Sequence, residues 1–200
     1  MKAALDTIWI LIQPERKPAD ELTLGLAAEA RRLLGRLGNA GKVVAVGMGV
    51  DSDSDLSELG SYGVDAVIYV RDETLTRYQG ELSAEVMERL LREHKPSLLL
   101  MGHTPETADL APRLAAVLEG ALVTRAVDLC VRPEGEAYAT RAVSNGYLFE
   151  EVHFPNDSRP HIVSFVPGVL TSEEPRTAAD IELRIESVKV PVVLQCRPPV

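Results

Sequence analysis

The residues that most often perform chemistry in proteins are scattered in this sequence. The four histidines, His94, His103, His153 and His161, lie at no spacing of three or four residues from one another or from a cysteine. A metal site would therefore have to be assembled entirely by the fold. No serine stands in a G-x-S-x-G turn, and no cysteine neighbours a histidine. We expect no metal site, no catalytic constellation and no enzyme activity.

An acidic run follows Gly47-Met48-Gly49 and contains Asp51, Asp53 and Asp55. Three aspartates would repel a phosphate, so this is not a phosphate-binding loop. The D-x-D-x-D pattern opens a calcium loop, but the sixth position is not glycine and the twelfth is not glutamate. We interpret the run as a strand-end turn followed by the N-cap of a helix.

The segment that begins at Gly102 is the best placed to bind a ligand. It follows the apolar run Ser97–Met101, which we predict to be a strand. In an open α/β sheet, ligands bind outside the carboxyl ends of the strands. Gly102, His103 and Thr104 are therefore candidates for a cofactor crevice or a docking surface.

The helix after this segment contains a proline, which costs about 3 kcal/mol in a helix interior. We therefore predict that Asp109 is the N-cap, so that Pro112 lies in the tolerated first turn and Arg113 projects from it. A second candidate segment carries Arg141 on a strand that runs into an Asn145-Gly146 turn.

The favoured interpretation of both arginines is a surface or edge ion pair, worth about 0–1 kcal/mol each. The alternative is docking of a partner carboxylate or a pyrophosphate, which the planar guanidinium group suits. The residues retained as crevice or docking candidates are Gly102, His103, Thr104, Arg113, Arg141 and Asn145.

Strand-like and helix-like segments alternate over the first 120 residues and must position these candidates. Short apolar runs alternate with segments of helical period, which predicts βαβ units. In the first predicted helix, Leu26 and Leu33 belong to an apolar stripe, whereas Glu29 is expected to face solvent. Because the strands are apolar on both faces, we predict a doubly wound, mostly parallel α/β sheet, Rossmann-like and similar to adenine nucleotide alpha hydrolases. The predicted strands are Thr7–Ile12, Lys42–Val46, Ala66–Val70 and Ser97–Met101.

After Gly120 the pattern changes to strands without intervening helices, which predicts antiparallel additions at the edge of the sheet. An apolar edge strand at Ile162–Val166 would need covering, which suggests an oligomer. A linker is expected at Thr171–Asp180, and the alternating run from Ile181 to Val190 could add a final strand. The four strands predicted after Gly120 are Ala121–Asp128, Glu136–Val143, Leu148–Phe154 and His161–Val166.

Charge and cysteine content exclude several classes of protein. The 30 acidic residues outnumber the 21 basic ones among 200 residues, giving a net charge of -9 that disfavours nucleic acid binding. No apolar run approaches the roughly 20 residues of a membrane span. Cys130 and Cys196 show no C-x-x-C spacing, so we expect two reduced thiols in a cytoplasmic protein.

Taken in order, these segments make the sequence similar to the amino-terminal domain of the electron transfer flavoprotein alpha subunit. Asp109–Ala116 matches that family's D-L-A-P-R-L-A-A helix, and Arg141 with Asn145-Gly146 matches its strand arginine and turn. Ser144-Asn145-Gly146 departs from the usual Gly-Gly-Asn, and Glu106-Thr107-Ala108 from Asn-Gly-Arg. The resemblance covers residues 7–170, which we expect to form one domain, with residues 171–200 as a linker and final strand. Further similarities are Ile8–Leu11, Leu59–Asp65 and the V-P-G-V segment within Pro160–Val169.

The resemblance implies a scaffold domain that pairs with a beta-type subunit in a heterodimer and supports FAD-mediated electron transfer from a dehydrogenase. Family members continue into a second domain that supplies most contacts to FAD, and no flavin-binding residue has a counterpart here. FAD is therefore expected in the complete complex and not on this chain alone, with a flavin-binding domain supplied in trans. AMP is a candidate ligand of the partner subunit.

A nucleotide-binding module of the universal-stress-protein kind remains the alternative, because its sheet is similar. Such proteins carry a G-x-x-G phosphate loop after the fourth strand, with a further glycine about nine residues later. Here Gly102 is followed by Thr104-Pro105-Glu106, and the next glycine is Gly120. The AMP- or ATP-binding alternative is therefore less favoured.

Overall fold

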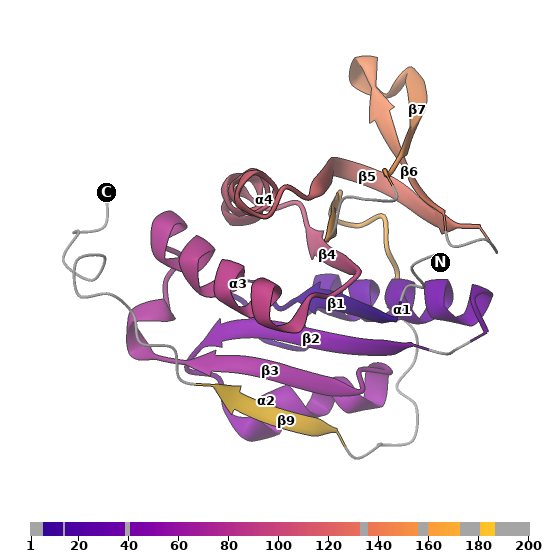
Figure 1. Ribbon diagram of the computed structural model, residues 1–200. Helices are drawn as coiled ribbons and strands as arrows, with labels where there is room; N and C mark the ends of the chain where they lie inside the picture. Colours follow the sequence, from indigo (N-terminus) through magenta and orange to yellow (C-terminus); the bar gives the residue numbers. More distant parts are fainter. Residues whose placement is uncertain are drawn as a thin grey trace.

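Strands and helices alternate along the first half of the chain and build a sheet with helices on both faces (Figure 1). The computed structural model describes residues 6–13, 15–38, 41–132, 136–155, 160–172 and 181–186. The helices are α1 Glu21–Arg36, α2 Asp53–Ser57, α3 Gly80–His94 and α4 Pro105–Leu118, with short 3-10 turns η1 Glu58–Tyr62, η2 Glu73–Leu75 and η3 Ser144–Gly146. The strands are β1 Thr7–Leu11, β2 Lys42–Gly49, β3 Ala66–Arg71, β4 Leu98–Gly102, β5 Ala121–Val131, β6 Ala137–Val143, β7 Leu148–His153, β8 His161–Phe165 and β9 Glu182–Glu186.

The strand order across the sheet is β7-β6-β5-β8-β4-β1-β2-β3-β9. Every pair from β5 to β9 in this order is parallel, and only β5–β6 and β6–β7 are antiparallel within the described residues. The predicted fold class, a doubly wound and mostly parallel sheet with antiparallel strands from the C-terminal part, is confirmed. The order reverses between β1 and β4, because β1, β2 and β3 run to one side and β4 lies on the other.

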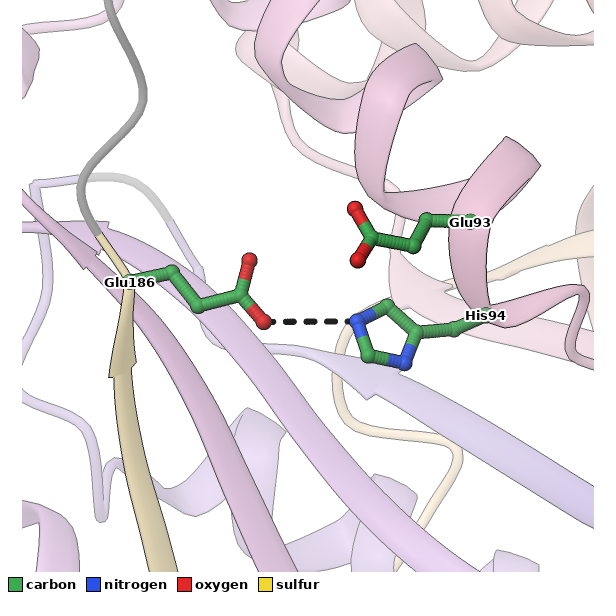
Figure 2. Close-up of side chains that lie close together, drawn as sticks. All are labelled: Glu93, His94 and Glu186. Carbon is green, nitrogen blue, oxygen red and sulfur yellow. Dashed lines mark hydrogen bonds and ion pairs between the residues drawn. The ribbon is translucent and has the colours of Figure 1, made fainter.

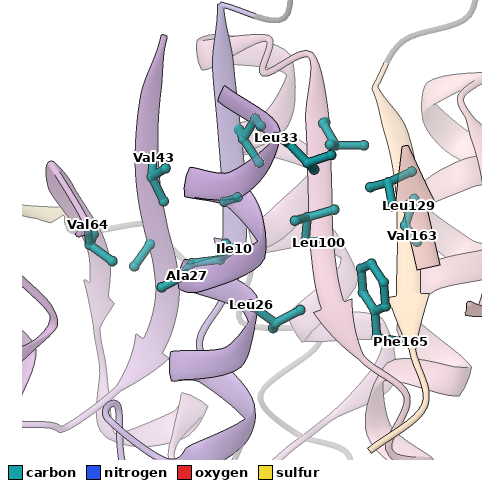
Figure 3. Packing of buried hydrophobic residues seen from close by; sticks show 14 of the residues in the cluster. Ile10, Leu26, Ala27, Leu33, Val43, Val64, Leu100, Leu129, Val163 and Phe165 are labelled. Atoms are coloured by element: carbon teal, nitrogen blue, oxygen red, sulfur yellow. The ribbon is translucent and has the colours of Figure 1, made fainter. Parts of the chain in front are cut away.

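Alternate residues of each central strand face two separate apolar layers. Ile10 and Val43 pack against Leu26 and Leu33 of α1 on one face (Figure 3). Trp9 packs on the opposite face, in the layer covered by α3 and α4. Since both faces are buried, each central strand is apolar throughout, as the sequence predicts for a parallel sheet.

Helix α1 begins and ends with ordinary caps but carries one unexpected buried charge. Asp20 accepts a hydrogen bond from the N–H of Thr23 at 2.8 Å, and Gly38 adopts φ 87° just beyond the helix end. Glu29, expected to face solvent, is only 7% exposed. Its carboxylate accepts two hydrogen bonds from Arg32, whose guanidinium also donates to the carbonyl of Leu129 on β5 at 2.6 Å. The prediction was wrong because Arg32 pairs with the buried carboxylate and links it to β5.

Helix α4 begins five residues earlier than predicted, because its N-cap is not Asp109. Thr104 is the N-cap, and it exchanges hydrogen bonds with Thr107 in a capping box, with Pro105 in the first turn. Pro112 therefore lies inside the helix, contrary to prediction. The side chains of Thr104 and Thr107 accept hydrogen bonds from each other's backbone N–H groups, which stabilises this earlier start, and the helix tolerates the interior proline.

Strand β8 is central, although the sequence was interpreted as giving an apolar edge strand there. It pairs in parallel with β4 on one side and with β5 on the other, and all five of its residues are buried. Its apolar character is thus satisfied inside the protein and gives no support to an oligomer.

Only part of the predicted C-terminal linker and final strand lies within the described residues. The run after Ile181 supplies β9, which pairs with β3. Most of the predicted linker, residues 173–180, and the rest of the last run, residues 187–190, lie outside the described residues, as does Cys196. Cys130 is a free thiol. The division of the chain at residue 170 stays a prediction.

Candidate functional site

The three crevice candidates that follow one another in sequence lie at the carboxyl end of β4 and tie it to its neighbours. A Cβ on Gly102 would lie 2.2 Å from Cδ2 of Leu22, so the glycine allows this side chain of α1 to approach. The N–H of His103 donates to the carbonyl of Phe165 on β8 at 2.7 Å. The side chain of Thr104 is used as the cap of α4. All three residues therefore have structural roles here.

His103 belongs to a small polar cluster that the sequence did not reveal. Its Nδ1 lies 3.1 Å from the hydroxyl of Ser164 on β8, and the backbone N–H of Arg125 donates to the same hydroxyl at 3.3 Å. Arg125 has φ 59°, at an irregularity where the register of β5 against β8 shifts. Burial, followed by the nearby charge of Arg125, lowers the pKa of His103.

A serine beside a neutral imidazole is part of many nucleophilic sites, but this pair cannot act as one as it stands. Ser164 is 0% exposed, so no substrate reaches its hydroxyl. The cluster instead satisfies polar groups at the β5 irregularity. Ser164 sits in an otherwise apolar run, which is why sequence patterns did not single it out.

Arg113 pairs with Asp109 one turn earlier on α4. The Nε–Oδ1 distance is 3.0 Å, and 46% of the Arg113 side chain is exposed. The other oxygen of Asp109 accepts a hydrogen bond from the hydroxyl of Tyr78 at 2.9 Å. Burial, together with this hydrogen bond, raises the pKa of Tyr78. Asp109 thus ties α4 to the segment before α3 instead of capping a helix.

Arg113 also lines an open groove of about 980 Å³ between α3 and α4. Four glutamates and three arginines surround it, so its charge is mixed and slightly acidic. Such a lining repels the pyrophosphate of a dinucleotide more than it attracts it. The groove is lined by Glu81, Ala84, Glu85, Glu88, Arg89, Arg92, Glu93, Arg113, Ala116 and Val117.

A second hollow, of about 450 Å³, lies at the carboxyl ends of β1 and β2 and contains none of the candidates chosen from the sequence. Arg16, Lys17 and Arg77 outnumber Glu15 and Asp51 among its lining residues, so we call it the cationic hollow, although its positive excess is small. Gln13 at its wall is 2% exposed, and its Oε1 has no hydrogen-bond partner within the described structure. The hollow thus lies outside the carboxyl ends of two parallel strands, where open α/β sheets bind ligands, but beside the strand pair at which the order reverses.

Arg141 and Asn145 belong to a projecting arm formed by the antiparallel β6–β7 hairpin (Figure 1). Arg141 pairs with Glu150 across the hairpin. Asn145, at the η3 turn, adopts φ 57°, a left-handed conformation that asparagine tolerates well. The three residues after Gly146 have exposed apolar side chains: Tyr147 is 86% exposed, Leu148 60% and Phe149 65%. We call these three residues the apolar tip.

The six candidates do not form one site. Gly102, His103 and Thr104 lie together at the end of β4, Arg113 faces the α3–α4 groove, and Arg141 and Asn145 lie on the arm. Both arginines make the ion pairs that their sequence context favoured. The apolar tip was missed because a lone Tyr-Leu-Phe triplet in a strand pattern is more often core.

Comparison with known proteins connects this geometry to one family. The model of the electron transfer flavoprotein domain matches residues 8–192. An electron transfer flavoprotein subunit alpha from Thermoanaerobacterium thermosaccharolyticum is 31% identical over 163 residues, which are 82% of this chain and 48% of that relative. Protein FixB of Clostridium saccharobutylicum is 29% identical over 81% of this chain and 48% of its own length. A subunit alpha from Clostridium acetobutylicum is 27% identical over 94% of this chain and 56% of its own length.

Proposed function

Because the chain belongs to the electron transfer flavoprotein domain family, we propose that it is an alpha-type scaffold domain that pairs with a beta-type subunit and supports FAD-mediated electron transfer. The chain spans about half the length of the curated relatives it matches. The activity of those whole proteins therefore enters here only as part of the proposal. No helix among the described residues is both long enough and apolar enough to cross a membrane.

The apolar tip carries the docking part of the proposal. Three adjacent large apolar side chains, each more than half exposed, stand at the end of a two-stranded arm. Exposed apolar residues gathered in this way mark interaction surfaces, and tyrosine and phenylalanine are enriched at the centres of such surfaces. Arg141 and Glu150, the cross-strand pair next to Phe149, supply a polar border that is already paired.

FAD fits this chain poorly on its own. The large groove between α3 and α4 has four glutamates on its walls, which disfavour a pyrophosphate. The cationic hollow at β1 and β2 could hold a phosphate-bearing group, but its 450 Å³ is less than half the volume of the groove. FAD would supply the redox chemistry when bound by the complete complex, and this chain's part would be to hold neighbouring domains in place.

Titration against a purified beta-type subunit tests the docking. We expect a one-to-one complex by isothermal titration calorimetry, and at least about tenfold weaker binding for the double variant Leu148→Ser and Phe149→Ser. Val117→Ser is the matched control, because Val117 is 46% exposed on α4, away from the arm. Absence of a complex with the unaltered chain, or equal weakening by the control, would refute this assignment of the arm.

The cationic hollow keeps the AMP- or ATP-binding module as a second candidate function. The small excess of positive charge favours a phosphate, and the unpaired Oε1 of Gln13 could accept a hydrogen bond from an amino or hydroxyl group of a nucleotide. Thermal unfolding with AMP, ATP or FAD separates the two, since a ligand at 100 times its dissociation constant stabilises by about 2.7 kcal/mol. The scaffold proposal expects a colourless chain with no shift, whereas a shift with AMP or ATP that is lost in Arg77→Ala would support the nucleotide module.

A further inference from the structure

Three potential metal ligands converge where the end of α3 meets the end of β9. Glu93 and His94 are the last two residues of α3, and Glu186 is the last residue of β9 (Figure 2). One ligand atom from each residue lies within 4.8 Å of the other two. Nε2 of His94 and Oε1 of Glu186 are 3.3 Å apart. Residues 92 positions apart in sequence thus form one cluster, which explains why spacing alone predicted no metal site.

The donor set is that of a transition-metal site. One imidazole nitrogen and two carboxylates are ligands that zinc accepts, at about 2.0–2.2 Å from the ion. Tetrahedral bonds of that length place neighbouring ligand atoms about 3.3 Å apart. The His94–Glu186 pair already has this spacing, and Glu93 is exposed enough to turn toward it by side-chain rotation alone.

The local charge is more negative than a histidine can balance. His94 faces two carboxylates, and within the described part of the chain the carboxylate of Glu93 makes no hydrogen bond or ion pair. The C-terminal end of α3 adds its partial negative charge at the same place. A divalent cation would neutralise this excess where an imidazole alone does not.

The imidazole is also held in place. The His94 side chain is 22% exposed and that of Glu186 28%. The His94 ring packs on Trp9 of β1, with ring centroids 5.4 Å apart. A ring fixed on one side by an indole loses little further freedom when its Nε2 binds an ion.

We propose that Glu93, His94 and Glu186 bind a zinc-type divalent ion, with water in the remaining coordination position. Among the described strands, β9 is held to the sheet by its pairing with β3. The ion would strengthen the attachment of β9 to α3 that the His94–Glu186 contact already makes. The position of this edge strand would then depend on metal.

The single tryptophan provides a direct measurement, because Trp9 touches His94. The full chain is treated with EDTA, freed of chelator and titrated with Co²⁺, whose unfilled d shell quenches a neighbouring indole. We expect saturable quenching with one ion per chain, its reversal by Zn²⁺, and a rise of the melting temperature with Zn²⁺. Glu93→Gln and Glu186→Gln should each weaken binding by more than about tenfold.

Three variants make the result decisive. His94→Gln should abolish saturable quenching, and because Glu93 is exposed, Glu93→Gln decides the matter if His94→Gln fails to fold. The control is Glu151→Gln, since Glu151 stands 3.9 Å from His153 in another histidine–glutamate pair and should leave metal binding unchanged. Quenching that never saturates in the unaltered chain, or that saturates at the same Co²⁺ concentration in Glu93→Gln as in the unaltered chain, would show that the cluster is only an ion pair.

Discussion

Nδ1 of His103 lies 3.1 Å from the hydroxyl of Ser164, so the turn after β4 is tied to the fully buried centre of β8. The lowered pKa of His103 gives this contact a dependence on pH. Between the ordinary pKa of 6.5 and the lowered folded value, the unfolded chain binds a proton that the folded chain does not. This contribution to stability is complete above about pH 6.5 and is lost as the pH falls toward the folded pKa.

Replacement of His103 by glutamine should flatten that dependence. Glutamine can still hydrogen-bond to Ser164 but does not titrate, so the loss of unfolding free energy between pH 7 and pH 5 should be smaller in His103→Gln than in the unaltered chain. Urea denaturation at several pH values measures it. His153→Gln is the control, because His153 is exposed on β7. If the unfolding free energy of His103→Gln depends on pH as steeply as that of the unaltered chain, His103 is not the group responsible.

Arg32→Met should destabilise the protein by leaving the buried Glu29 carboxylate without its cation. We expect a loss of about 2 kcal/mol, less than for a fully buried pair because 33% of the Arg32 side chain is exposed. Adding Glu29→Gln to Arg32→Met should recover part of the loss. Chemical denaturation of both variants checks this, and a double variant no more stable than the single one would count against the pairing.

Gly120→Ala should cost about 1–3 kcal/mol. A Cβ at this position would lie 2.6 Å from the carbonyl oxygen of Pro160, which belongs to the backbone entering β8. Gly102→Ala is the comparison, since its Cβ would meet only the side-chain end of Leu22, which can rotate away. Thermal unfolding should therefore show a larger fall in melting temperature for Gly120→Ala than for Gly102→Ala. The reverse order would contradict the close contact between Gly120 and the backbone of Pro160.

Pro112→Ala should stabilise the chain. The proline lies inside α4 and is exposed, so alanine would restore a helical N–H without filling or emptying any core space. We expect a gain of about 1 kcal/mol, because some of the 3 kcal/mol propensity difference is offset by the greater freedom of the unfolded chain. Circular dichroism melting measures it, and a loss of stability would show that the proline serves packing.

The sequence predicted the layered body well because periodicity reports burial directly. Continuous apolar runs at β1 to β4, each of strand length, and the apolar stripe of α1 are typical of a sheet covered on both faces. The start of α4 was mispredicted because the cost of Pro112 was weighed without the capping box of Thr104 and Thr107. The place of β8 could not be inferred, since a buried central strand and an apolar edge strand have the same composition.

The functional site was predicted less well than the fold. Gly102, His103 and Thr104 were identified by strand-end position alone, and position does not reveal that each is already engaged by its neighbours. The cationic hollow and the Glu93–His94–Glu186 cluster join residues from separate elements, so they cannot be predicted from the spacing of residues along the sequence.

The insertion of β8 between β4 and β5 sets the order in which the protein can be completed during synthesis. Until residue 165 has left the ribosome, β4 and β5 each present an unsatisfied row of backbone groups, and the two halves of the sheet cannot join. A nascent chain that folds β1 to β5 before β8 emerges would therefore carry two open strand edges, a form exposed to aggregation and to chaperones.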